Sequence, residues 1–128
     1  MYAIEIRDHI MIAHSLPSEF FGQAQGMHGA TFIVDVTFCR ERLDEHNVVV
    51  DIGKASRVLA DVLKPIDYAN LDVLPIFAEK ITTTEFLCRH IFDRIEEALK
   101  AGELGESGRG VERIRVTLSE SHVARAWF

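Results

Sequence analysis

The chain has 128 residues, of which 48% are hydrophobic and 27% charged, proportions typical of one soluble globular domain spanning residues 1–128. Its net charge is −6 and its basic residues are interspersed with acidic ones, which argues against a nucleic-acid partner. No apolar run approaches the roughly 20 residues that cross a bilayer, and the first residues lack the layout of a signal peptide. We therefore expect a cytoplasmic protein with no membrane partner.

The first part of the chain predicts two strands joined by a long loop. Loose alternation and β-branched residues indicate a strand over roughly residues 2–14, and a second apolar run indicates a strand over residues 31–38. Residues 16–27, rich in Gly, Gln, Pro and Ser, are predicted as a loop. The two strands are expected to pair antiparallel. A loop of about a dozen residues between them points to a function, because such loops are otherwise uncommon.

Two helices are predicted next. After a charged turn at residues 40–47, apolar residues at helical spacing predict a helix over residues 52–63, which Pro65 ends. Residues 66–81 read as irregular. Thr82-Thr83-Thr84-Glu85 has the form of a capping box and predicts the start of a second helix, whose apolar stripe runs from Phe86 to Leu99.

The C-terminal part predicts a glycine-containing loop and two more strands. The loop covers residues 102–110, and alternation predicts strands over residues 111–118 and 123–128. Two strands, two helices and two strands in this order give an α+β fold class.

Two histidines stand at the ends of the first two strands. His14 closes the first strand and His28 precedes the second, so pairing of the strands would bring both to one face at one end of the sheet. Two imidazoles can contribute to a zinc site, but such a site needs at least three protein ligands. Taken alone, each histidine is more often a hydrogen-bonded structural residue.

Six short motifs in one order, covering nearly the whole chain, resemble the 6-pyruvoyl-tetrahydropterin synthase and 6-carboxytetrahydropterin synthase family. The motifs are Ala13-His14-Ser15-Leu16, Met27-His28-Gly29-Ala30, Asn47 to Ile52, Ile66 to Asp72, Thr82 to Phe86 and Ser119-Glu120-Ser121. The resemblance implies the tunnelling fold, a four-stranded antiparallel sheet with two helices on one face. It also implies closure into a barrel as a trimer or hexamer, with active sites between subunits.

The resemblance further implies a zinc ion held by three histidines. His14 and His28 match two of these positions, but the third is occupied by Ala30, which has no ligand atom. Zinc would require a substitute ligand. The remaining histidines, of which His122 is the first to test, are His9, His46, His90 and His122.

The catalytic pattern of the family is also incomplete here. The family's lyases use a Cys or Glu in the loop before the second strand, whereas residues 22–27 contain neither and the nearest carboxylate is Glu19. In place of the family's Asp-His pair stand Asp67 and Tyr68. A tyrosine with an ordinary pKa of about 10 is a poor base near neutrality but can donate a proton. Asp67, Tyr68 and His122 are therefore the catalytic candidates.

The best-retained position is the glutamate that anchors the pterin ring in the family. Glu120 matches it, and a carboxylate suits the two parallel N–H donors of that ring edge. Thr83 and Glu85 at the predicted helix start are further binding candidates, although capping alone accounts for Glu85. These residues leave three hypotheses: a lyase-like enzyme acting on a dihydropterin side chain by a changed reaction, a non-catalytic pterin- or purine-binding paralogue, and a purely structural oligomer.

Overall fold

One long β-hairpin forms the backbone of the structure. The computed structural model describes all residues, Met1–Phe128, and places strand β1 at Tyr2–His14 and strand β2 at His28–Arg40. These strands pair antiparallel over their whole length, from Tyr2 opposite Arg40 to His14 opposite His28. The first strand is confirmed at its predicted limits. The second is longer than the predicted residues 31–38, because β1 offers a partner to every residue from His28 to Arg40.

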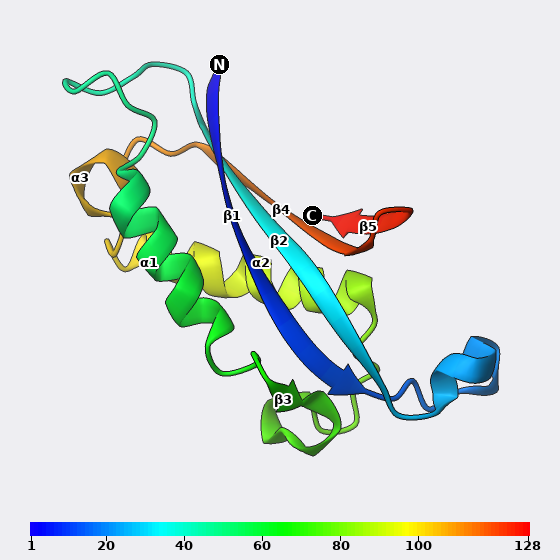
Figure 1. Cartoon of the computed structure of the whole chain (residues 1–128). Coiled ribbons are helices and arrows are strands. Elements are labelled where there is room, and N and C mark those ends of the chain that lie inside the picture. The colour runs from blue at the N-terminus through cyan, green and yellow to red at the C-terminus, as the bar shows by residue number, and fades with distance from the viewer.

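The remaining elements follow in the predicted order (Figure 1). Helix α1 spans Ile52–Leu63, α2 spans Thr84–Lys100, and strands β4 and β5 span Arg113–Ser121 and Ala124–Trp127. The predicted irregular regions contain a two-residue strand and short helical turns, namely η1 (Glu19–Gln25), β3 (Ala69–Asn70), η2 (Leu71–Val73), η3 (Pro75–Phe77) and α3 (Gly105–Gly108). In Figure 1 the segment with η1 projects beyond the end of the β1–β2 hairpin.

The sheet has one strand more than expected. Its order is β3-β1-β2-β4-β5, and β3 pairs parallel with Ile12 and Ala13 of β1, so the sheet is not purely antiparallel. The Asp67 carboxylate accepts hydrogen bonds from the backbone N–H groups of Met11 (2.9 Å) and Tyr68 (3.0 Å), which fixes the chain beside β1. The sheet is not closed within one chain.

Both long helices pack on one face of the sheet. The buried residues of β1, β2 and β4 in the hydrophobic core are all even-numbered, from Ile6 to Leu118, and they pack with buried residues of α1 and α2. This alternation follows from the strand period of two, which directs neighbouring side chains to opposite faces. The two predicted helices on one face are therefore confirmed.

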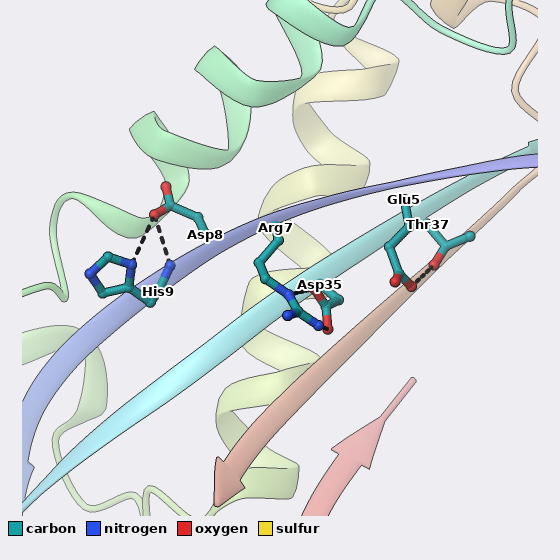
Figure 2. Close-up of polar contacts among 6 residues, drawn as sticks. All are labelled: Glu5, Arg7, Asp8, His9, Asp35 and Thr37. Atoms are coloured by element: carbon teal, nitrogen blue, oxygen red, sulfur yellow. Dashed lines mark hydrogen bonds and ion pairs between the residues drawn. The ribbon is translucent and has the colours of Figure 1, made fainter. Parts of the chain in front are cut away.

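The other face of the sheet is polar and lacks a helical layer. Arg7 donates from Nε and Nη2 to the two carboxylate oxygens of Asp35, at 2.6 and 3.0 Å, and Thr37 donates to Glu5 at 2.7 Å (Figure 2). Asp35 is itself buried and lies opposite Arg7 in the β1–β2 register. A bidentate guanidinium contact supplies the partner that a buried carboxylate needs.

Helix α1 begins at Ile52, where the sequence predicts it, whereas the N-cap of α2 differs from the predicted one. Asp51 caps α1 by accepting from the Lys54 N–H at 3.0 Å. For α2 the predicted capping box from Thr82 to Glu85 is wrong, because the N-cap is Thr83, whose hydroxyl accepts from the Phe86 N–H at 3.2 Å. Thr82 is buried before the helix.

None of the helices combines the length and apolar character that a membrane-spanning segment requires.

Candidate functional site

His14 and His28 are brought together by the register of the hairpin. They form the last pair of the β1–β2 ladder, and their ring centroids are 4.6 Å apart with an interplanar angle of 66°. His14 is only 2% exposed. Burial, followed by the proximity of His28, lowers the pKa of His14 below its usual value, so its ring is neutral at neutral pH. The predicted meeting of the two histidines on one face is confirmed.

Each of the two rings is held through its Nδ1 atom. His14 Nδ1 lies 3.0 Å from Thr82 Oγ1, and His28 Nδ1 lies 2.9 Å from the carbonyl oxygen of Gly26. A carbonyl only accepts, so His28 Nδ1 carries a proton, and in the neutral form of the ring the lone pair is on Nε2. His14 Nε2 is buried and has no hydrogen-bond partner. In their neutral forms the two histidines thus leave Nε2 of His28 and Nε2 of His14 without a hydrogen bond inside the chain.

A cavity of about 220 Å³ adjoins His14, between the N-terminus of α2 and the β4–β5 hairpin. It is lined by His14, Leu16, Phe21, Thr83, Thr84, Glu85, Glu120, Ala124, Arg125 and Ala126. A neighbouring hollow of about 550 Å³ shares Glu120, Ala124 and Arg125 with it. Ligand pockets usually measure roughly 300–1,000 Å³, so a ligand larger than the first cavity would extend into the second.

Glu120 supplies the carboxylate of the cavity. It lies on β4, and one of its oxygens accepts a hydrogen bond from the Thr84 hydroxyl at 3.3 Å. Thr84 is the first residue of α2, whose N-terminal end carries a partial positive charge that favours a nearby anion. The remaining lone pairs of Glu120 are free for a ligand. Arg125 is the only lysine or arginine among the lining residues.

The structure brings together five of the eight predicted site residues. Glu120, Thr83 and Glu85 line the cavity, and His14 lines it beside His28. Thr83 also caps α2, so its hydroxyl accepts from the protein itself.

The three predicted catalytic residues lie outside this cavity. The Asp67 carboxylate accepts from two backbone N–H groups, and Tyr68 is 80% exposed with a positive φ of 53°, beside a separate hollow over β1 and β2. His122, in the turn between β4 and β5, lines only the neighbouring hollow. Within one chain, none of the three lines the first cavity.

The residues present do not fit a complete zinc site within the chain. His14 and His28 each form a contact through Nδ1, as metal-binding histidines usually do to leave Nε2 for the metal. Zinc needs at least a third protein ligand. No group of three or more His, Cys, Asp or Glu side chains is placed to hold a metal. Within a single chain, none of the candidate substitutes, His122 included, is placed to complete a three-ligand group with His14 and His28.

Three polar residues of the site are not among those that the sequence predicts. The Thr82 hydroxyl contacts His14, although the sequence indicates a helix cap there, and the Thr84 hydroxyl donates to Glu120. Arg125 has no motif that distinguishes it from other surface arginines. A run of three threonines before an apolar helix was the only available signal for Thr82, because just one of them can be the N-cap.

Nearly the whole chain matches a known protein family. Residues 3–128 match the family model described as 6-pyruvoyl tetrahydropterin synthase. Among curated relatives, human 6-pyruvoyl tetrahydrobiopterin synthase is 26% identical over 105 residues, which cover 72% of each chain. The 6-carboxy-5,6,7,8-tetrahydropterin synthase of Bacillus subtilis is 27% identical over 109 residues, covering 77% of this chain and 69% of the relative.

Solved structures show the same fold. The 6-pyruvoyl tetrahydropterin synthase of Caenorhabditis elegans superposes with a TM-score of 0.81 at 21% identity, covering 99% of this chain and 94% of that one. The Plasmodium vivax protein of the same name gives a TM-score of 0.77 at 17% identity, covering 100% and 98%. At these identities the likeness establishes the architecture and leaves the reaction to be argued from the site.

Proposed function

The chain belongs to the 6-pyruvoyl tetrahydropterin synthase family, and we propose that it binds a dihydropterin-type ligand in the cavity beside His14. The observation that carries this proposal is the position of Glu120. Its carboxylate lines the cavity, is oriented by Thr84 and lies beside the N-terminal end of α2. A carboxylate in this position can accept two parallel N–H donors from the 2-amino group and the ring of a pterin.

The lining of the cavity suits a flat, partly polar ring. Leu16, Phe21 and Ala126 supply apolar contact, while Glu120 and Arg125 supply charge at the side that opens to the neighbouring hollow. Only four of the ten lining residues are hydrophobic, so the cavity offers several hydrogen-bonding groups beside a smaller apolar surface, which fits a ring with polar edges. The side chain of the ligand then extends toward His14 or into the second hollow.

The reaction of the standard family members is not part of this proposal. The loop before β2 lacks a Cys or Glu at residues 22–27, the third zinc position is Ala30, and Asp67 is engaged by backbone N–H groups. These differences all affect the chemistry and leave the sheet, the helices and Glu120 in place. They favour ligand recognition with a lost or changed reaction.

A second candidate is a lyase-like reaction on the ligand's side chain, completed by a neighbouring subunit. Its support is Tyr68, which is 80% exposed beside β1 and therefore accessible to another chain. The outer edge of β1 pairs with β3 at only Ile12 and Ala13, which leaves its other backbone groups for a partner strand. Closure of the sheet into a trimeric or hexameric barrel would satisfy that edge, and the mass in solution by light scattering tests it.

Ligand titration tests the binding proposal. We expect a reduced pterin to bind the wild type, with a change in ligand fluorescence, and Glu120→Gln to weaken binding by roughly 10- to 100-fold, since a hydrogen bond to a charged group contributes about 1.5–3 kcal/mol. Glu103→Gln, an exposed carboxylate in the turn after α2, is the matched control. Equal affinities for Glu120→Gln and the wild type would show that Glu120 is not the anchor. Appearance of a product during the titration would favour the lyase-like candidate.

A further inference from the structure

His14 and His28 are each held through Nδ1, as metal-ligating histidines usually are, although a third ligand is missing. His28 Nδ1 donates to the Gly26 carbonyl, and His14 Nδ1 forms a hydrogen bond with the Thr82 hydroxyl. A hydrogen bond at Nδ1 therefore restrains the rotation of each ring. In metal sites such contacts orient the ring and direct the other nitrogen at the metal. Here His14 Nε2 is buried without a partner, next to the ring of His28.

Ala30 occupies the position from which a third ligand would reach this pair. It lies two residues after His28 on the same strand, and its partner in the register is Ile12, two residues before His14. Because side chains alternate along a strand, His14, His28 and Ala30 all point to the helix-covered face. Ala30 is half-buried and packs against the core, so its methyl group leaves this corner without a donor atom.

No other residue of the chain replaces the missing ligand. His90 packs on Phe77 with ring centroids 4.9 Å apart, and His122 lines the neighbouring hollow. His9 contacts Asp8, and His46 contacts Glu45 in a loop. Accordingly, no cluster of three His, Cys, Asp or Glu side chains is found anywhere in the chain.

We propose that this chain does not retain zinc by itself and that the alanine at position 30 is the reason, because the other two histidines lie together and each is held through Nδ1. Two neutral imidazoles leave zinc with two water ligands, whereas catalytic zinc sites use three protein ligands and one water. The inference concerns the pterin-family cavity proposed above but does not depend on which ligand binds there. It predicts that one substitution rebuilds the metal centre.

Zinc content tests the inference directly. Untagged protein is stripped with a chelator, incubated with zinc chloride, desalted and analysed for zinc per chain. We expect well below one zinc in the wild type and about one in Ala30→His, because the substitution supplies the third imidazole. Thr31→His is the matched control, since residue 31 is on the same strand but its side chain points to the opposite face. It should retain no more zinc than the wild type.

Two further variants keep the test decisive. Adding His14→Ala to Ala30→His should abolish zinc retention, which shows that the metal uses the predicted pair. If Ala30→His fails to fold by circular dichroism, Ala30→Cys introduces a smaller ligand at the same position. Cobalt(II) in the rebuilt site should show the visible absorption of tetrahedral coordination.

Two results would overturn the inference. About one zinc per wild-type chain would mean that a ligand from a neighbouring subunit completes the pair. If Ala30→His and Ala30→Cys both fold but retain no zinc, residue 30 does not determine whether the chain binds zinc. Neither result uses a pterin, so failure of this inference is distinguishable from failure of the proposed ligand binding, which the Glu120→Gln titration tests.

Discussion

Thr82 Oγ1 lies 3.0 Å from Nδ1 of His14, and both side chains are buried. The two residues are 68 positions apart, so this contact ties the end of β1 to the segment that leads into α2. It fixes the His14 ring beside the cavity and uses a hydroxyl that the helix itself does not need, because Thr83 is the cap.

Thr82→Val tests the importance of this contact. Valine keeps the shape of threonine but leaves His14 Nδ1 buried without a partner, which should lower the free energy of unfolding by about 1–3 kcal/mol. Urea denaturation of the two proteins measures the difference. Thr31→Val, at an exposed threonine, should change the stability little. An equal decrease in the free energy of unfolding in the two variants would indicate a general effect of removing a threonine.

Substitutions of Asp67 separate a structural from a catalytic role. Asp67→Ala removes the acceptor of the Met11 N–H, whereas the Tyr68 N–H keeps the Met11 carbonyl oxygen at 2.7 Å, so stability should fall by about 1–2 kcal/mol. Asp67→Asn retains Oδ1 as an acceptor and should remain within about 0.5 kcal/mol of the wild type. Thermal denaturation checks both. A residue with only a catalytic role would leave the stability of both variants unchanged.

A double-mutant cycle tests the contact between Arg7 and Asp35 on the open face of the sheet (Figure 2). Arg7→Met leaves the carboxylate of Asp35, whose side chain is only 9% exposed, without its partner, so it should destabilise the protein. In an Asp35→Asn background the same substitution should lower the free energy of unfolding by less, because no charge is then left unpaired. Urea denaturation measures the four proteins, with Arg115→Met as control. If Arg7→Met lowers the free energy of unfolding equally in both backgrounds, Arg7 and Asp35 are not energetically coupled.

Acidification should destabilise the protein through His90. Burial, followed by the charge of Arg94, lowers the pKa of His90, while Asp93 and Glu97 oppose this shift. The unfolded chain, with an ordinary histidine pKa near 6.5, then binds the proton more readily than the folded one. Stability from this residue is fully present above about pH 6.5 and is lost as the pH falls through the lower, folded value.

Urea denaturation between pH 8 and pH 5 measures this dependence. His90→Gln should make the decrease in unfolding free energy on acidification smaller, whereas His46→Gln, in an exposed loop, controls for the general loss of a histidine. An unchanged slope in His90→Gln would rule out His90 as a source of the acid sensitivity.

Local patterns were sufficient to predict most of the fold and part of the site. The period of two in β1 and β2 placed His14 and His28 on one face, and helical spacing gave α1 at Ile52–Leu63. Glu120, which the motif predicts as a binding residue, lines the cavity, and its role there stays a prediction. These features depend on residues close together in sequence or on the pairing of two consecutive strands, which backbone geometry strongly constrains.

The limits of prediction appear where segments distant in sequence meet. The strand pattern alone predicts that two imidazoles meet at one strand end, and the residue at position 30 has no donor atom whatever the fold. The contacts of Thr82 with His14, of Thr84 with Glu120, and of Asp67 with backbone N–H groups are visible only once the chain is folded. The packing of α2 and of the chain around β3 against the sheet determines which polar groups meet, and local periodicity carries no information about that packing.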